Sequence, residues 1–102
     1  MNKKMIQQAQ QMQARLKSMQ DEIAKTITES SAGGGVIKVK ILGGNKIESI
    51  SIDPNVIDPD DVEMLEDLIT AAINEGMEMY QKSAAEKMKS IVSINFPPKP
   101  DS

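Results

Sequence analysis

The side chains that could do chemistry in this 102-residue chain are carboxylates, lysine ammonium groups, one guanidinium and one phenol. The chain has no His and no Cys, so the most common general base, the usual zinc ligands and the thiol nucleophile are all missing. Their absence argues against zinc-type metal sites and Cys–His catalysis. We therefore expect no metal site and no catalytic residue of these kinds.

Acidic residues gather where the chain turns into its second helix. The group comprises Asp53, Asp58, Asp60 and Asp61. Pro54 and Pro59 interrupt it, and the central Gly and terminal Glu of an EF-hand loop are missing, so helix capping is the better explanation. The glycine runs at 33–35 and 43–44 lack the Gly-Lys-Ser/Thr ending of a phosphate-binding loop and predict turns. These patterns predict neither an enzyme nor a bound cofactor.

Positive charge is concentrated in the first half of the chain. Residues 1–52 hold eight Lys or Arg against four acids, a net of +4, whereas residues 53–102 hold four Lys against eleven acids, a net of −7. This asymmetry can give an acidic molecule one basic surface for nucleic acid, although a mixture of solvated charges is the simpler interpretation. The candidate DNA-binding residues are Lys3, Lys4, Arg15 and Lys17, with possible help from Lys38, Lys40 and Lys46.

A long first helix must position most of these cations. Apolar residues recur at alternating spacings of four and three, which defines a heptad seam of Met5, Ala9, Met12, Leu16, Met19 and Ile23. The residues between them favour helix and include no Gly or Pro, so a helix is predicted over about 2–24. Lys3, Lys4 and Lys17 fall away from the seam. The seam itself needs a partner, either a second helix of the same chain or its copy in another subunit.

Three strands are predicted after this helix, over about 25–30, 36–42 and 46–53. In the middle strand apolar residues alternate with Lys38 and Lys40, which is typical of a half-buried strand. The sequence Gly43-Gly44-Asn45 predicts a hairpin turn. Ile47 is out of phase with the later isoleucines of its strand, which predicts a β-bulge near Glu48-Ser49.

A second amphipathic helix is predicted over about 59–91. Asp58 is the expected cap and Pro59 the first helical residue, while Gly76 is the weak point of the helix. The Pro-rich end, residues 95–102, cannot continue a helix and is predicted to be a flexible tail. The predicted fold is therefore α+β, with helix, three-stranded antiparallel sheet and helix in one domain over 1–94.

The size and composition of the chain predict an oligomer in a reducing compartment. A single domain of this length buries a modest fraction of its surface alone, so oligomerisation is expected. The absence of Cys agrees with the cytoplasm. No segment has the continuous apolar stretch of a signal peptide or membrane span, so no membrane partner is expected.

Several segments, taken in order, carry a family resemblance: residues 7–13, 31–39, 52–54, 63–69, 71–74 and 86–88. In sequence and spacing they resemble the YbaB/EbfC family of bacterial nucleoid-associated proteins over nearly the whole chain. The resemblance implies an intertwined homodimer whose helices project like tweezers, and DNA binding without a demanding sequence requirement. It also implies no cofactor, no catalysis, and a location in the cytoplasm, associated with the nucleoid.

Two departures from the family pattern remove positive charge. The chain starts almost at its first helix, where family members often carry a Gly-rich basic extension, and Glu78-Met79 stands where some relatives have a basic pair. The leading hypothesis is a homodimer that binds duplex DNA largely through phosphates, contributing to nucleoid organisation or gene regulation. In it the seam of the first helix packs near the sheet of the intertwined dimer.

The alternative is a protein-interaction module that docks onto a replication or repair protein. Flexible Met residues of the seam would adapt to such a partner, and the Phe96-Pro97-Pro98 tail could also dock. The acidic half of the chain favours this alternative.

Overall fold

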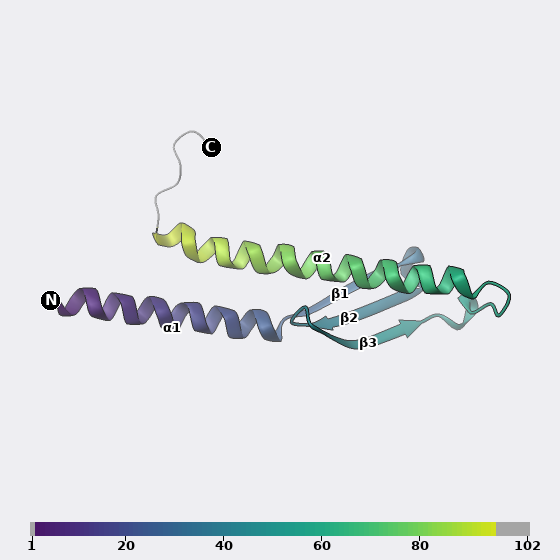
Figure 1. Ribbon diagram of the computed structural model, residues 1–102, viewed down its shortest axis with the longest axis horizontal. Helices are drawn as coiled ribbons and strands as arrows, with labels where there is room; N and C mark the ends of the chain where they lie inside the picture. Colours follow the sequence, from purple (N-terminus) through teal and green to yellow (C-terminus); the bar gives the residue numbers. More distant parts are fainter. Residues whose placement is uncertain (1, 96–102) are drawn as a thin grey trace, which may run out of the picture.

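Two long helices and a three-stranded sheet form the subunit (Figure 1). The computed structural model describes residues 2–95, with side chains through Ser90. Its elements in chain order are α1 (Lys3–Lys25), β1 (Ile27–Ala32), β2 (Ile37–Leu42), β3 (Lys46–Ile52) and α2 (Val62–Asn95). The strands pair antiparallel in the order β1-β2-β3. This arrangement confirms the predicted α+β fold.

Polar residues mark both ends of α1. The side chain of Asn2 accepts a hydrogen bond from the Lys4 N–H at 3.0 Å and so satisfies one of the free donors of the first turn. The helix ends where Thr26 adopts an extended backbone. Because Thr26 caps α1, β1 begins at Ile27, two residues later than predicted.

The cap of α2 is Asp61, so the predicted start of this helix with Asp58 as its cap and Pro59 in its first turn is wrong. The Asp58 carboxylate accepts from a backbone N–H two residues on, at 2.9 Å, and its carbonyl accepts from the Asp61 N–H at 3.0 Å. These residues therefore form a separate turn. Asp61 then accepts from the Met64 N–H at 3.3 Å, and α2 begins at Val62.

The hairpin and the bulge of the sheet are both confirmed. Gly43-Gly44 turns between β2 and β3 with φ angles of 61° and 74°, the left-handed region that favours glycine. The register shifts after Lys40, so that Ile41 pairs with Ile47 and Glu48 is the extra residue. The bulge returns Ile47 to the apolar face of the sheet.

Helix α2 covers one face of β1 and β2 at very close range. The buried cluster consists of Ile37, Val39, Ile41 and Ala72. Within it the Ser30 hydroxyl donates a hydrogen bond of 2.6 Å to the Ala72 carbonyl. A Cβ atom on Gly76 would lie 2.6 Å from Ile41 Cδ1 and 2.7 Å from Ser30 Oγ. The interpretation of Gly76 as a weak point of the helix is thus corrected. Because Gly76 has no side chain, α2 can pack closely against the sheet.

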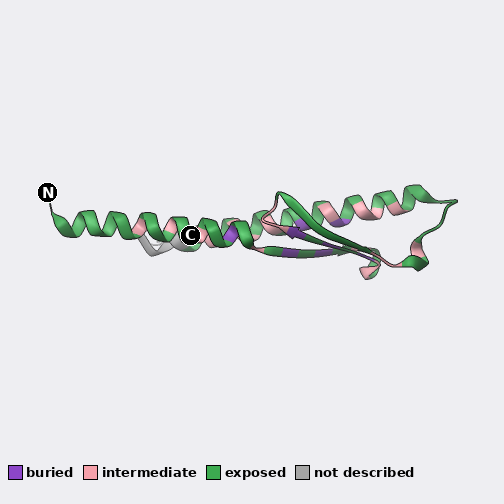
Figure 2. Cartoon of the chain, turned by 90° about the horizontal axis from the view of Figure 1, so that it is seen from below, coloured by how far each residue is buried: buried purple, intermediate pink, exposed green. Residues whose placement is uncertain are grey.

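Both helices extend past the sheet at the same end of the molecule (Figure 1). We call α1 and residues 79–95 of α2 the two arms. The subunit measures 72 × 33 × 15 Å, and its radius of gyration is 20.0 Å, against about 13 Å for a compact domain of this size. Figure 2 shows buried residues concentrated at the sheet, while the arms are mostly exposed.

Helix α2 continues to Asn95, four residues beyond its predicted end. The predicted tail over 95–102 therefore starts one residue too early, and the rest of it lies outside the described residues. No helix among residues 2–95 combines the length and the apolar composition that a bilayer span requires.

Gly76→Ala should destabilise the fold, although Ala is the better helix former by about 1 kcal/mol. The added methyl group would overlap Ile41 and Ser30, and overpacking of this kind costs about 1–3 kcal/mol. We expect a net loss of about 1 kcal/mol in the free energy of unfolding, measured by urea denaturation at one fixed protein concentration.

Ile41→Val is the matched control, because it removes the Cδ1 atom that the new methyl group would meet. In the double variant the two losses should be less than additive, since the sites share one contact. An unchanged or higher urea midpoint for Gly76→Ala would contradict the close packing.

Candidate nucleic-acid interface

Helix α1 carries a row of exposed cations with no acidic neighbour over most of its length. The row consists of Lys3, Lys4, Arg15 and Lys17, and the first acid of the helix is Asp21. At 3.6 residues per turn Lys3 and Lys17 fall on the side of α1 away from the seam, while Lys4 and Arg15 lie at its flanks. The structure therefore places the four leading DNA-binding candidates along one rigid rod.

Helix α2 brings three more lysines to the same end of the molecule. Lys82, Lys87 and Lys89 lie in the arm of α2, which runs antiparallel beside α1 (Figure 1), and Glu86 is the only acid among residues 79–95. In the sequence they belong to the acidic half, residues 53–102, whose net charge gave no reason to predict a basic surface there. The predicted order of helix, antiparallel sheet and helix could have indicated them, because in such a fold the end of the second helix lies beside the first helix.

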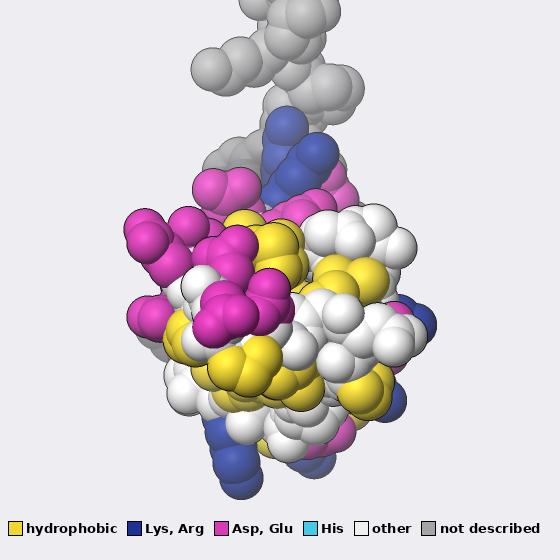
Figure 3. Space-filling model, turned by 90° about the vertical axis from the view of Figure 1, so that its right-hand side faces the viewer, with side chains coloured by type: hydrophobic (Ala, Val, Ile, Leu, Met, Phe, Trp, Pro, Cys, Tyr) yellow, Lys and Arg dark blue, Asp and Glu magenta, His cyan; other side chains and the backbone are white. Residues whose placement is uncertain are grey.

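Charge in the folded subunit is divided between its two ends. The arms, residues 2–26 and 79–95, hold eight Lys or Arg against three acids, a net of +5. Residues 27–78, which form the sheet and the part of α2 above it, hold three Lys against eleven acids, a net of −8. Figure 3 shows acidic side chains gathered at the sheet end. The basic surface is thus formed by both helices and is larger than the sequence halves indicated.

The three candidate lysines of the sheet lie apart from the row on α1. Lys38 and Lys40 alternate with the buried residues of β2, so they project from the face opposite α2. Lys40 Nζ lies 3.7 Å from Glu29 Oε1, in an exposed ion pair of the kind that contributes about 0–1 kcal/mol. Lys46 is exposed at the start of β3, at the end of the sheet nearest α1.

The heptad seam is covered at the base of α1 and bare at its tip. Exposure falls from 67% at Met5 to 9% at Ile23. Between them the seam is exposed at Ala9 and half-buried from Met12 onward. Within one chain α1 runs beyond the sheet and meets α2 (Figure 1), so packing of the seam near the sheet of an intertwined dimer stays a prediction.

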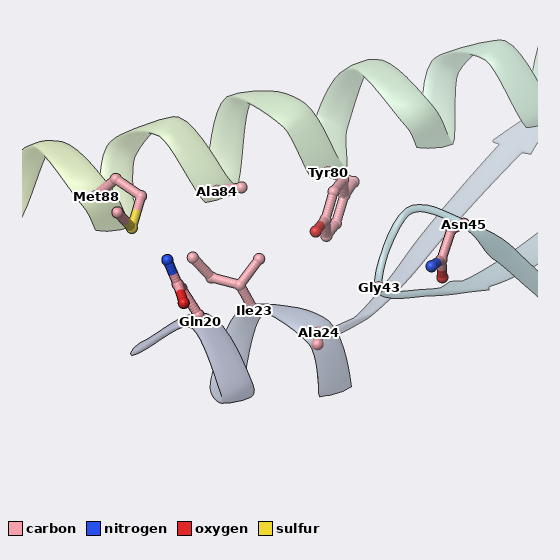
Figure 4. A pocket seen from close by; sticks show the side chains of 8 residues that line it. All are labelled: Gln20, Ile23, Ala24, Gly43, Asn45, Tyr80, Ala84 and Met88. Atoms are coloured by element: carbon pink, nitrogen blue, oxygen red, sulfur yellow. The ribbon is translucent and has the colours of Figure 1, made fainter. Parts of the chain in front are cut away.

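A hollow of about 440 Å³ lies where the two arms meet (Figure 4). Its lining residues are Gln20, Ile23, Ala24, Gly43, Asn45, Tyr80, Ala84 and Met88. The Tyr80 phenol is the one ionisable side chain in this lining, so the hollow holds no acid–base pair. Among the described residues, no three His, Cys, Asp or Glu side chains are grouped to hold a metal ion.

Besides the tip of the seam, a second apolar surface is left uncovered, namely the part of the apolar face of the sheet that β3 forms. Ile47 pairs with Ile41 and Ile50 pairs with Val39, and cross-strand partners share a face. Ile41 and Val39 are buried, whereas Ile47 and Ile50 are 43% and 42% exposed. The difference arises because α2 packs on β1 and β2 and leaves β3 largely uncovered.

Known proteins resemble this chain in sequence over most of its length. The sequence model described as the YbaB/EbfC DNA-binding family matches residues 1–94. The chain is 47% identical over 89 residues to a nucleoid-associated protein of Chloroflexus aurantiacus, covering 87% of this chain and 89% of that protein. It is 44% identical over 94 residues to a nucleoid-associated protein of Thermoanaerobacter pseudethanolicus, covering 91% and 85%.

The fold also resembles the crystal structure of an uncharacterized protein from Helicobacter pylori. The TM-score is 0.70 at 18% sequence identity, and the match covers 90% of this chain and 98% of that chain. The helix–sheet–helix arrangement with projecting arms is therefore found in a solved structure of distant sequence.

Proposed function

This chain belongs to the YbaB/EbfC DNA-binding family, and on that premise we propose that it binds duplex DNA as a homodimer in the bacterial nucleoid. Binding takes place largely through phosphates and with little sequence preference. The nucleoid lies in the cytoplasm, and the similar proteins named above as nucleoid-associated support this location. They also support a role in nucleoid organisation or gene regulation.

The observation that carries the proposal is the basic surface of the arms. Eight Lys or Arg against three acids lie on two neighbouring helices, although the whole chain is acidic. Cations that neutralise phosphates release bound counterions, which favours binding to any duplex sequence. Lys3, Lys4, Arg15 and Lys17 provide the main contacts, Lys82 and Lys89 add to them, and Lys38, Lys40 and Lys46 give secondary help.

Low sequence preference follows from the kinds of side chain on the arms. Seven of the eight arm cations are lysines. Lysine neutralises phosphates as a point charge on a flexible stem, without the planar fork that Arg uses to read guanine. Tyr80 is the one aromatic residue within 2–95 and lines the hollow between the arms, so the described surface offers no platform for stacking bases.

A homodimer accounts for the apolar surfaces that one subunit leaves uncovered. The β3 half of the sheet exposes Ile47 and Ile50, and the tip of α1 exposes Met5. Isologous pairing of two subunits covers the same patch on both and doubles every basic cluster. The proposed dimer therefore links the stability of the fold to the charge available for DNA.

The proposed function includes no catalysis and no cofactor. The chain lacks His and Cys, and the hollow between the arms is lined without a carboxylate. Binding through phosphates needs neither a nucleophile nor a metal ion.

A second candidate function is docking onto a replication or repair protein. Ile57 and Val62 are 55% and 53% exposed at the sheet end, beside the acids that precede α2. An apolar patch with an acidic rim suits a basic protein partner. Affinity capture from lysate treated with nuclease distinguishes the two functions, because partners held through DNA are lost and direct partners remain.

Reversal of three arm lysines should abolish DNA binding. The variant Lys3→Glu/Lys4→Glu/Lys17→Glu reverses six cations of the homodimer. If all six contact phosphates in the parent protein, they account for about five of its slope of log affinity against log salt. A gel-shift series over rising salt, with sedimentation of the same samples, measures both binding and assembly.

The matched control is Lys38→Glu/Lys40→Glu/Lys46→Glu, which reverses the same number of charges on the sheet. It should weaken binding less than the arm variant does. If the arm variant binds DNA as well as the parent protein, or the sheet variant loses more, the arms are the wrong surface.

Ile50→Asp should convert the proposed homodimer into monomers. The side chain is 42% exposed in one subunit, so a carboxylate there stays hydrated in a monomer but would be buried without a partner in an interface. Sedimentation velocity measures the change.

Ser49→Asp serves as the control, because Ser49 lies beside Ile50 on β3 but faces the opposite side, where it pairs with Lys40. This variant should remain dimeric. A dimeric Ile50→Asp protein would show that the interface lies elsewhere.

A further inference from the structure

We infer that Lys87 is a positioning residue, which bonds to Thr26 and sets the separation of the two arms instead of contacting phosphate. The inference rests on the proposed function, in which the arms carry the DNA-binding cations. The Gly43-Gly44 turn of the hairpin is the second part of this contact region. We call the Lys87–Thr26 bond and this turn together the joint between the arms.

Thr26 connects all three parts of the subunit at the base of α1. Its hydroxyl donates to the Glu22 carbonyl in the last turn of α1 at 2.8 Å, and accepts from Lys87 Nζ of α2 at 3.2 Å. Its carbonyl accepts from the Gly43 N–H at 2.9 Å in the hairpin turn. One residue thus ties the end of α1 both to the arm of α2 and to the sheet.

The hairpin turn packs closely against the bases of both arms. A Cβ atom on Gly43 would lie 2.4 Å from the Ala24 carbonyl oxygen of α1. A Cβ atom on Gly44 would lie 2.2 Å from Cε2 of the Tyr80 ring of α2. Figure 4 shows the turn beside these two helices. Even a methyl group here would force one arm to move.

The Lys87 ammonium differs in its surroundings from the cations of the α1 row. Lys87 is half-buried and its bond to Thr26 is partly shielded, whereas Lys3, Lys4 and Lys17 are exposed. A hydrogen bond from a charged donor is shorter and stronger than one between neutral groups. Its charge is therefore used to join the arms.

Small changes at this joint are amplified along the arms. Ile23 near the base is the buried residue of α1 at 9% exposure, and exposure rises toward the tip, to 67% at Met5. Helix α1 has 23 residues and is about 34 Å long at 1.5 Å per residue, so a rotation of about 10° at the base moves the tip by about 6 Å. That is twice the length of a hydrogen bond, so Lys3 and Lys4 would lose their phosphates.

The experiment measures the distance between the arms in the full-length protein without DNA. Because the chain has no Cys, Gln8→Cys and Ser90→Cys provide one spin label on each arm, both at exposed positions. Labelled protein is refolded with an excess of unlabelled protein, so that double electron–electron resonance reports distances within one subunit.

Lys87→Met and Thr26→Val should each broaden or shift the distance distribution, and the double variant should change it no further. Each should also lower DNA affinity about tenfold, because binding must then bring the arms to the separation that the bond sets in the parent protein. Thr26→Val changes no charge, so its effect cannot come from a lost phosphate contact. Thr26→Ser keeps the hydroxyl and should behave as the parent protein.

Lys82→Met is the matched control, since it removes the same charge from an exposed position on the same arm. It should lower DNA affinity without changing the distance distribution. Parent-like distances in both Lys87→Met and Thr26→Val would overturn the inference. If the parent protein fails to bind DNA, the proposed function is wrong, while the distances still decide whether the joint exists.

Discussion

The close approach of α2 to the sheet determines where the other parts of the subunit can lie. Gly76 and the bond from Ser30 to the Ala72 carbonyl hold the helix against β1 and β2. Helix α2 has 34 residues and the strands have six or seven, which gives lengths of about 51 Å and about 20 Å. A helix fixed at that point must extend past the sheet, and this length difference produces the arm.

The two parts of α2 that result from this length difference carry opposite charges. Acids lie along the part of α2 above the sheet, and lysines lie along the part that extends beyond it. At physiological ionic strength charges are screened over about 8 Å, whereas the subunit is 72 Å long. The two ends therefore act as separate electrostatic surfaces, and a net charge of −3 says little about what the arms attract.

Local patterns were sufficient to predict the elements but not their contacts. Alternation and glycine turns predicted the hairpin and the bulge at Glu48, because both depend on neighbouring residues. Asp58 and Asp61 are equally suited to cap a helix, and only the folded turn selects Asp61. The role of Gly76 and the contribution of Lys82, Lys87 and Lys89 depend on segments far apart in the sequence, which no periodicity reveals.

The small core gives the arms little support within one chain. Four residues form the buried cluster at the sheet, and both arms project away from it. Isolated helices of this length are marginal in water, since most of their stability comes from packing an apolar face. The bare tip of the seam and the uncovered β3 face are the surfaces left for that packing. In the proposed homodimer, assembly would stabilise the same helices that present the cations to DNA, so folding, association and binding are thermodynamically linked.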